Sequence, residues 1–287
     1  MTKSIKDYAN LVKFEHTVFA LPFALIGFFL AFRIGAYDFS YFLIIKVLAC
    51  MVLARNAAMG FNRYLDRQYD AANPRTAKRE IPSGIVTPVN ALIFVVVNSL
   101  LFIIVCWFIN KRCFYLAPVA LFVILVYSYT KRVTPLCHFV LSSGLALAPI
   151  GAFLAVTGEF SLLPLLYSFA VFFWVSGFDI IYACQDIDFD TKNNLKSIPV
   201  MVGIKKALIL SAVTHLFTLL FVVLAGIGLK SGILYWIGVC IFGVLIIFQH
   251  AIVKPDDLSR VNLSFGTTNG IASIVFAAFV IASFYFL

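Results

Sequence analysis

The feature that most restricts the fold of this chain is a series of nine apolar stretches, each about 20 residues long. They lie at 17–36, 41–64, 88–109, 114–130, 136–157, 161–184, 207–229, 231–252 and 266–287. A helix of that length crosses a hydrocarbon core of about 30 Å, and within lipid it satisfies its own backbone hydrogen bonds. Because 62% of the residues are hydrophobic and only 12% are charged, we predict an all-α integral membrane protein, with nine transmembrane helices in one bundle around a central cavity.

No polar stretch between these helices is long enough to fold as a soluble unit, so we expect the whole chain, 1–287, to form a single polytopic domain. Residues 1–16 precede the first apolar stretch. They carry charges on one side of a helix and Ile5, Tyr8 and Leu11 on the other. This pattern is typical of an amphipathic segment that lies on the membrane surface.

Basic residues divide unequally between the two ends of the expected helices. Sixteen Lys and Arg fall on the side of the N-terminus and five on the opposite side, with Arg55 inside a span. Because cytoplasmic loops collect Lys and Arg, we predict a multi-pass protein of the cell inner or plasma membrane, with its N-terminus and the polar loops 65–87 and 185–206 in the cytoplasm. The net charge of 22 − 13 = +9 suits anionic lipid or an anionic substrate and does not by itself argue for nucleic acid.

Two acidic motifs lie where apolar helices are expected to leave the membrane on that side. In the first, Asn62, Asp66 and Asp70 recur every four residues, so on a helix their oxygen atoms share one face. The second motif carries Asp179, Asp186, Asp188 and Asp190. Clustered carboxylates repel each other unless cations lie between them, and hard oxygen ligands without His or Cys favour Mg²⁺. Since Mg²⁺ commonly bridges carboxylates to phosphates, the motifs predict a site for a phosphorylated substrate.

Basic side chains surround both motifs. They are Arg63, Arg67, Arg75, Lys78, Arg79, Lys131, Arg132, Lys192 and Lys196. Such groups can hold a diphosphate and stabilise it as it leaves. We favour this role for Arg79 and Lys131, whereas Arg75, Lys205 and Lys206 are interpreted as anchors at the membrane surface.

Arg55 lies seven residues before Asn62, about two helical turns, and therefore deeper in the membrane on the same side of its helix. An arginine within a span is costly and usually has a partner or a water-filled cavity. No acid in helix 41–64 can pair with it. Either Arg55 faces a cavity, or it extends its side chain to the interface.

Cysteine and histidine are interpreted as structural. The six cysteines are dispersed, contain no Cys-x-x-Cys pair and lie mostly in apolar stretches, so we expect them to be reduced packing residues. His138, His215 and His250 appear isolated along the chain, and His16 belongs to the amphipathic segment. We expect no catalytic histidine.

Four segments together resemble the UbiA superfamily of intramembrane prenyltransferases. They are Asn-Arg-x-x-Asp-x-x-x-Asp at 62–70, Ile-Pro-Ser-Gly at 81–84, Tyr-Ser-Tyr-Thr-Lys-Arg at 127–132 and Asp-x-x-Tyr-x-x-x-Asp-x-x-x-Asp at 179–190. Many members have Asn-Asp where this chain has Asn62-Arg63, so the role of that additional acid is not carried over. The segment 14–22 is similar to the 4-hydroxybenzoate polyprenyltransferase-like group of the superfamily.

The resemblance implies a mechanism and a set of site residues. Asp66, Asp70, Asp186 and Asp190 would hold Mg²⁺ against the diphosphate of an isoprenoid donor, and an electron-rich aromatic ring would attack the carbon that diphosphate leaves. Asp179 is the candidate base for the ring proton, and Arg55 would bind the carboxylate of the acceptor. The substrate-binding set expected is Arg55, Asn62, Arg63, Arg79, Tyr127, Lys131, Tyr182, Lys192 and Lys196.

The leading hypothesis is therefore a Mg²⁺-dependent polyprenyltransferase of ubiquinone or menaquinone synthesis, with 4-hydroxybenzoate as the first candidate acceptor. A dihydroxynaphthoate of menaquinone synthesis is the alternative acceptor. A cation transporter is the alternative from another class, although it would place its charges in mid-span, facing a pathway open to both sides. A CDP-alcohol phosphotransferase would require Asp-Gly and Ala-Arg elements that are absent in the expected arrangement. We expect membrane lipids as surroundings and no nucleic acid or obligate protein partner.

Overall fold

The structure is a computed structural model that describes residues 5–12 and 19–286. These residues form helices and no strand: α1 (Ile5–Leu11), α2 (Leu21–Ile34), α3 (Tyr41–Leu65), α4 (Arg67–Ala72), α5 (Pro88–Trp107), α6 (Lys111–Val133), α7 (Cys137–Thr157), α8 (Leu162–Ala183), the 3₁₀ turn η2 (Cys184–Asp186), α9 (Ile187–Lys192), α10 (Ile198–Val202), α11 (Ile204–Gly228), α12 (Ile233–Ile252), the π-helical η3 (Leu263–Thr268) and α13 (Asn269–Ser283). The all-α prediction is confirmed. His16 and most of the family-like segment 14–22 lie outside the described residues.

Eight of the described helical segments are long and apolar enough to cross a membrane. The remaining apolar helix, α2, has only 14 residues. At 1.5 Å per residue it extends about 21 Å, less than the thickness of a hydrocarbon core. The multi-pass architecture is therefore confirmed, and the count of nine complete spans stays a prediction, because residues 13–18 before α2 are not described.

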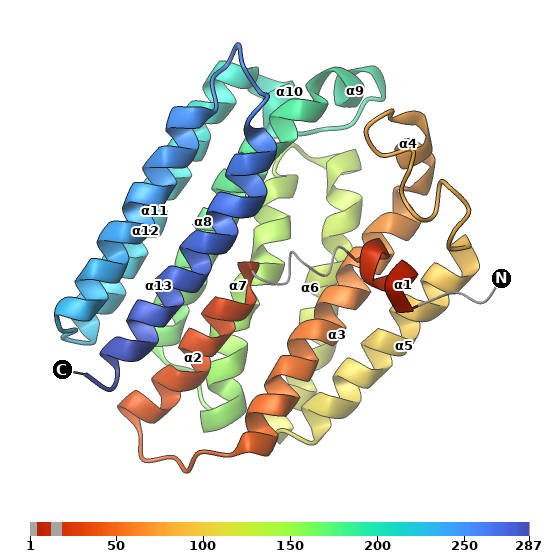
Figure 1. Ribbon diagram of the computed structural model, residues 1–287. Coiled ribbons are helices and arrows are strands. Elements are labelled where there is room, and N and C mark those ends of the chain that lie inside the picture. Colours follow the sequence, from red (N-terminus) through yellow and green to blue (C-terminus); the bar gives the residue numbers. More distant parts are fainter. Residues whose placement is uncertain (1–4, 13–18, 287) are drawn as a thin grey trace.

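The helices stand side by side in one bundle (Figure 1). Helix α2 packs on α7 and α13, α3 packs on α5 and α6, and α8 packs on α7 and α11. The short helices α4, α9 and α10 all lie at one end of the bundle, which we call the motif end (Figure 1). Both acidic motifs therefore reach the same end of the molecule, as predicted from their positions at helix ends.

Helix boundaries follow from local chemistry. Ser40 and Asn110 begin α3 and α6 by accepting hydrogen bonds from backbone N–H groups three residues later, at 3.3 and 2.8 Å. Such N-caps satisfy donors that the first helical turn leaves without partners. Gly158 ends α7 with φ of 68°, a left-handed conformation that glycine adopts at little cost.

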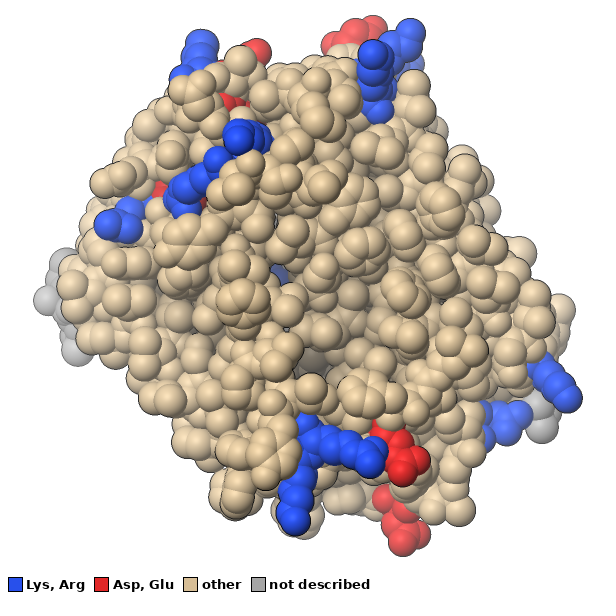
Figure 2. Space-filling view, turned by 180° about the vertical axis from the view of Figure 1, so that it is seen from behind, with Lys and Arg blue, Asp and Glu red and all other residues tan. Residues whose placement is uncertain are grey.

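The bundle is held by close helix contact and aromatic packing. A Cβ atom on Gly27 would lie 2.0 Å from the carbonyl oxygen of Pro149, so α2 approaches α7 as near as a glycine allows. One turn before Gly27 in α2, the buried ring of Phe23 packs against the rings of Trp174 and Phe276. On the face shown in Figure 2, a broad uncharged band covers the middle of the helices, and most charged side chains lie toward the two ends of the helices. This distribution suits a lipid environment.

The described part of the N-terminal segment packs on protein. Leu11 is fully buried against Ile81, Val86 and Ala91, and the ring of Tyr8 stacks on Phe94 with centroids 4.9 Å apart. The apolar side of α1 therefore covers α5 and the loop that precedes it.

Candidate active site

The first motif spans the junction of α3 and α4. Asp66 ends α3 and begins α4, with φ of −87° and ψ of 7°. The Asp66 N–H donates to Asn62 O at 2.9 Å, and the Asp70 N–H donates to Asp66 O at 2.8 Å. These bonds keep the four-residue spacing across the junction, so the side chains remain on one side, and the Asn62 amide donates to Asp66 Oδ2 at 3.1 Å.

The second motif also spans a change of helix type. Helix α8 ends at Ala183, a 3₁₀ turn leads to Asp186, and α9 then carries Asp190. Asp190 is fully buried, whereas Asp188 is exposed. Only part of the acidic cluster therefore faces the interior.

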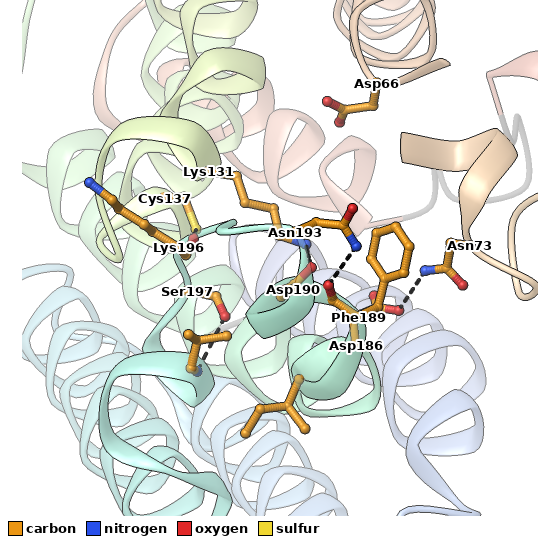
Figure 3. Close-up of polar contacts among 12 residues, drawn as sticks. Asp66, Asn73, Lys131, Cys137, Asp186, Phe189, Asp190, Asn193, Lys196 and Ser197 are labelled. Atoms are coloured by element: carbon orange, nitrogen blue, oxygen red, sulfur yellow. Dashed lines mark hydrogen bonds and ion pairs between the residues drawn. The ribbon is translucent and has the colours of Figure 1, made fainter. Parts of the chain in front are cut away.

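The two motifs line one polar cavity of about 340 Å³ at the motif end. Asp66 stands across from Asp186 and Asp190 in this cavity (Figure 3). The expected site residues that line it are Arg55, Asn62, Arg63, Asp66, Asp70, Arg79, Tyr127, Lys131, Asp179, Tyr182, Asp186 and Asp190. The tertiary fold thus brings together two motifs that are more than a hundred residues apart.

Each of the four expected metal-binding aspartates is paired with a basic side chain. The pairs are Asp66 with Arg132 at 2.7 Å, Asp70 with Arg79 at 2.6 Å, Asp186 with Arg75 at 2.5 Å and Asp190 with Lys131 at 2.8 Å. Burial raises the pKa of Asp66, and the charge of Asp70 raises it further, although Arg132 opposes the shift. The cavity therefore combines anionic groups for a cation with cationic groups for an anion.

Arg75 connects the two motifs, which corrects its interpretation as a membrane anchor. Its Nε and Nη2 donate to the two carboxylate oxygens of Asp186 at 3.0 and 2.5 Å, and its Nη1 donates to the Tyr182 hydroxyl at 2.8 Å. The Asn73 amide also donates to Asp186, at 3.3 Å (Figure 3). Burial lowers the pKa of Arg75, but the Tyr182 hydroxyl and the Asp186 carboxylate outweigh it and raise the pKa above its usual value. No local sequence signal indicates this pairing, because Arg75 and Asp186 are 111 residues apart.

The carboxylates fit a hard divalent cation by their chemistry. Asp70 Oδ2 and both oxygens of Asp190 are buried without a hydrogen-bond partner among the described residues. Arg63 makes an ion pair with Asp70 Oδ2 at 4.0 Å, and Lys131 makes one with Asp190 Oδ1. Oxygen atoms of this kind are preferred Mg²⁺ ligands. Within residues 5–12 and 19–286, however, no three Asp, Glu, His or Cys side chains stand close enough to enclose a metal ion. The donor set therefore suits an ion that shares its coordination with phosphate and water, as Mg²⁺ does.

A second, apolar cavity of about 360 Å³ adjoins the polar one. Both are lined by Arg55, Met59, Tyr127, Leu141 and Leu145. The Arg55 guanidinium also lies 3.5 Å from Val12 O, beneath the N-terminal segment. Arg55 and Tyr127 therefore stand at the junction of a charged chamber and a hydrocarbon chamber.

The apolar cavity opens sideways between α6 and α7. Among its lining residues, Val119 of α6 is 57% exposed, and Phe160, just after α7, is 63% exposed. Gly151 of α7 is also exposed, and a Cβ there would meet nothing within 4 Å. The uncharged band is hollowed near the centre of the face on which α6 and α7 lie (Figure 2).

Two expected substrate-binding lysines lie outside the polar cavity. Lys192 is exposed at the end of α9 and does not line the cavity. The Lys196 side chain points away from Asp190, and its Nζ donates to Val133 O at 2.9 Å (Figure 3). Its backbone N–H donates to Lys131 O at 2.7 Å, so Lys196 supports the end of the helix that carries Lys131. The structure therefore places both lysines apart from the other expected site residues, and their substrate-binding role stays a prediction.

The described histidines are not isolated, contrary to the interpretation of the sequence. His138 of α7 lies in the polar cavity, with Nδ1 2.7 Å from Asp179 Oδ2 of α8. His215 and His250 form a second pair, with ring nitrogens 2.7 Å apart. Each pair joins different helices, so sequence spacing gives no indication of it.

An aromatic wall, Phe178, Tyr182 and Phe265, completes the polar cavity. The ring centroids of Phe178 and Phe265 are 5.4 Å apart, and those of Tyr182 and Phe265 are 4.2 Å apart. Phe265 belongs to the π-helical turn η3 that precedes α13. Such turns often occur at functional sites, and the sequence alone gave no reason to select this phenylalanine among 31.

Curated relatives share most of the chain. The 4-hydroxybenzoate octaprenyltransferase of Tolumonas auensis is 28% identical over 243 residues, which are 85% of this chain and 85% of that protein. The 4-hydroxybenzoate octaprenyltransferase of Cronobacter sakazakii is 30% identical over 226 residues, 78% of this chain and 77% of the relative.

Solved structures share the fold. The apo structure of a UbiA homolog from Aeropyrum pernix K1 is 33% identical, with a TM-score of 0.84 over 93% of this chain and 98% of that chain. The structure of a UbiA homolog from Archaeoglobus fulgidus bound to DMAPP and Mg²⁺ is 22% identical, with a TM-score of 0.73 over 98% of this chain and 100% of that chain. That second likeness concerns the fold alone. The model of the UbiA prenyltransferase family matches residues 20–285, so the chain belongs to that family, as its motifs suggested.

Proposed function

We propose that this protein transfers a polyprenyl group from polyprenyl diphosphate to an aromatic carboxylic acid, with 4-hydroxybenzoate as the first candidate. The observation that carries the proposal is the junction of two cavities at Arg55 and Tyr127, one charged and one apolar. A prenyl diphosphate has this same division into an anionic head and a hydrocarbon tail. The names of the relatives as 4-hydroxybenzoate octaprenyltransferases support the choice of acceptor.

The diphosphate would lie between the two acidic motifs. Asp66, Asp70, Asp186 and Asp190 would hold Mg²⁺, which when bound neutralises the diphosphate and stabilises the charge that it gains on leaving. Arg79 and Lys131, now paired with Asp70 and Asp190, are placed to donate to the phosphate oxygens. A UbiA homolog from Archaeoglobus fulgidus binds DMAPP or GPP together with Mg²⁺ in solved structures, which supports the choice of Mg²⁺ and a prenyl diphosphate.

The prenyl tail would lie in the apolar cavity and leave it sideways. Val119, Phe160 and Gly151 border the opening between α6 and α7. A tail longer than the cavity can extend into lipid there without exposing apolar surface to water. The proposed donor would thus remain largely within the membrane while its head group reaches the acids.

The acceptor would lie between Arg55 and Asp179. Arg55 would bind its carboxylate, and the aromatic wall would pack against its ring. Asp179 would take the proton that the ring loses. From the distribution of basic residues we also infer that the motif end faces the cytoplasm, where small aromatic acids are soluble.

The test is an assay of the purified protein with a polyprenyl diphosphate, Mg²⁺ and one acid at a time, either 4-hydroxybenzoate or a dihydroxynaphthoate. We expect a prenylated product with one acid and no product after removal of Mg²⁺ with EDTA. Asp66→Asn should lower kcat at least about 100-fold, because it removes a carboxylate from the proposed metal site. The proposal would be overturned if the protein transferred a prenyl group to neither acid over a range of tail lengths. Full activity in EDTA would overturn the assignment of Mg²⁺ to the site.

A further inference from the structure

His138 has a fixed hydrogen-bonding environment on both ring nitrogens. The residue is 2% exposed and sits near the start of α7. Its Nδ1 lies 2.7 Å from Asp179 Oδ2, and its Nε2 accepts the backbone N–H of Ile198 at 3.3 Å. Ile198 begins α10, in the same loop that carries Asp186 and Asp190.

The contact with Ile198 determines which nitrogen carries the proton. A backbone N–H can only donate, so Nε2 of His138 must present its lone pair. The proton of the neutral imidazole is then on Nδ1, which donates to the Asp179 carboxylate. This tautomer leaves the ring without a free lone pair, so His138 cannot itself remove a proton from a substrate.

Asp179 is the partner that faces the reaction. Its side chain is 20% exposed, and it lines the polar cavity together with Tyr182 and Phe178 of the aromatic wall. With Oδ2 engaged by the imidazole, Oδ1 is the oxygen available to a substrate. A carboxylate with one oxygen held by a donor keeps a single orientation.

We propose that His138 is a positioning residue for Asp179 in the loss of the ring proton, an inference that rests on the proposed function. The C–O bond of the donor breaks, and its electron pair leaves with diphosphate. Two π electrons of the acceptor ring form the new C–C bond at the allylic carbon. The electron pair of the ring C–H bond then restores the aromatic ring, and the proton passes to Asp179 Oδ1 and later to water. His138 keeps its Nδ1 proton throughout, and the α10 loop holds it in place through Ile198 N–H.

A structural role is the competing explanation, because a buried pair between α7 and α8 also holds two helices together. The two roles differ in what the removal of His138 does to the chemical step. If His138 only joins helices, its loss lowers the amount of folded enzyme and changes all steps alike. If it positions the base, its loss slows proton removal in particular.

The experiment uses the full-length protein and an acceptor deuterated at the ring position that is alkylated. In the wild type we expect a kinetic isotope effect on kcat near 1, because proton loss from the alkylated ring is fast. His138→Leu should lower kcat up to about 100-fold, as the loss of a residue that orients a functional group does, with the KM of donor and acceptor changed less than about threefold. Its isotope effect should rise to about 2 or more, because proton removal becomes rate-limiting.

Amide variants keep the test valid if His138→Leu folds poorly. His138→Asn places an N–H near the position of Nδ1 and should restore kcat at least about tenfold over His138→Gln, whose amide reaches only the position of Nε2. His250→Leu is the matched control, because it breaks the other histidine pair away from the cavity. Its isotope effect should equal that of the wild type.

Two results would overturn the inference: an isotope effect in the His138 variants equal to that of the wild type, or equal activities of the Asn and Gln variants. Additive losses on combining His138→Leu with Asp179→Asn would also oppose it, since residues that act through one another are not additive. These outcomes differ from failure of the proposed function, in which the wild type itself transfers no prenyl group to either acid.

Discussion

At the scale of single residues, the site is close to charge balance before any substrate binds. Asp190 is fully buried and its Oδ1 meets Lys131 Nζ at 2.8 Å, while Asp70 is 6% exposed and meets Arg79. Buried charges are tolerated when they are paired, and removal of one partner leaves the other uncompensated. The pairs thus allow the acids to be present in a chamber that borders the hydrocarbon interior.

Lys131→Met should destabilise the protein because it leaves the Asp190 carboxylate buried without its cation. We expect a loss of about 2 kcal/mol, below the full value for a buried pair because the Lys131 side chain is 34% exposed. The measurement is thermal unfolding in detergent at neutral pH. The double variant Lys131→Met/Asp190→Asn serves as control and should recover part of the loss, and an equally unstable double variant would contradict the explanation.

At this scale the sequence predicted the arrangement of side chains where it depends only on spacing along one helix. It did not predict pairs whose two members are far apart in the chain. The four-residue spacing of Asn62, Asp66 and Asp70 is local, so the shared face follows from helix geometry. Arg75 and His138 have partners 111 and 41 residues away, on other elements. These pairings depend on how the helices pack, and the neighbouring residues in the sequence do not indicate that packing.

At the scale of elements, the loop after α4 is tied across the polar cavity. Arg75 and Asn73 both donate to Asp186, which lies beyond the end of α8. The contacts join the polar segment after the first motif to the second motif. They add a tie at the mouth of the cavity to the apolar packing that Ile81 and Val86 of this segment make with Leu11.

Arg75→Gln should loosen this segment. Without the guanidinium, the two contacts to Asp186 and the contact to Tyr182 are lost. We expect faster amide hydrogen exchange in residues 66–87 and an increase in donor KM of about tenfold, as for a lost charge-assisted contact. Arg67→Gln is the matched control, because Arg67 donates to Tyr64 O within its own part of the chain. Equal rates of amide hydrogen exchange in the two variants would contradict the view that Arg75 holds this segment to the second motif.

The apolar stretches predicted helix positions well because membrane thickness fixes their length. Helix α3 was expected at 41–64 and is observed at Tyr41–Leu65. The last span differs: its first turns are π-helical from Leu263 to Thr268, before the regular helix α13. A π turn widens the helix to accommodate one residue more, and hydropathy does not distinguish it from an ordinary turn.

At the scale of the whole molecule, the two cavities divide the bundle into chambers of different chemistry. The charged chamber lies at the motif end, and the apolar chamber lies among α3, α5, α6 and α7. The sequence predicted a central cavity but not this division, because the walls combine residues from distant helices. Only Arg55, an arginine inside a span, indicated that the polar region extends deep into the bundle.

Gly151→Leu should shift the preference of the enzyme toward donors with shorter prenyl tails. The new side chain has room at the opening between α6 and α7, since a Cβ on Gly151 meets no atom within 4 Å. It would narrow the route of a long tail but spare a short one, so we expect kcat/KM to fall about tenfold for a long polyprenyl diphosphate and less than twofold for dimethylallyl diphosphate. Val213→Leu, on a partly exposed position of α11 that lines neither cavity, is the control. Equal losses for both donors would mean that the tail takes another route.

The sideways opening between α6 and α7 also determines which concentration of donor would govern the rate. A donor of the proposed kind would arrive by lateral diffusion in two dimensions, so its relevant concentration is a mole fraction among lipids and not a molarity in buffer. Addition of inert lipid at constant amounts of enzyme and donor would therefore slow turnover, whereas a change in the aqueous volume would not.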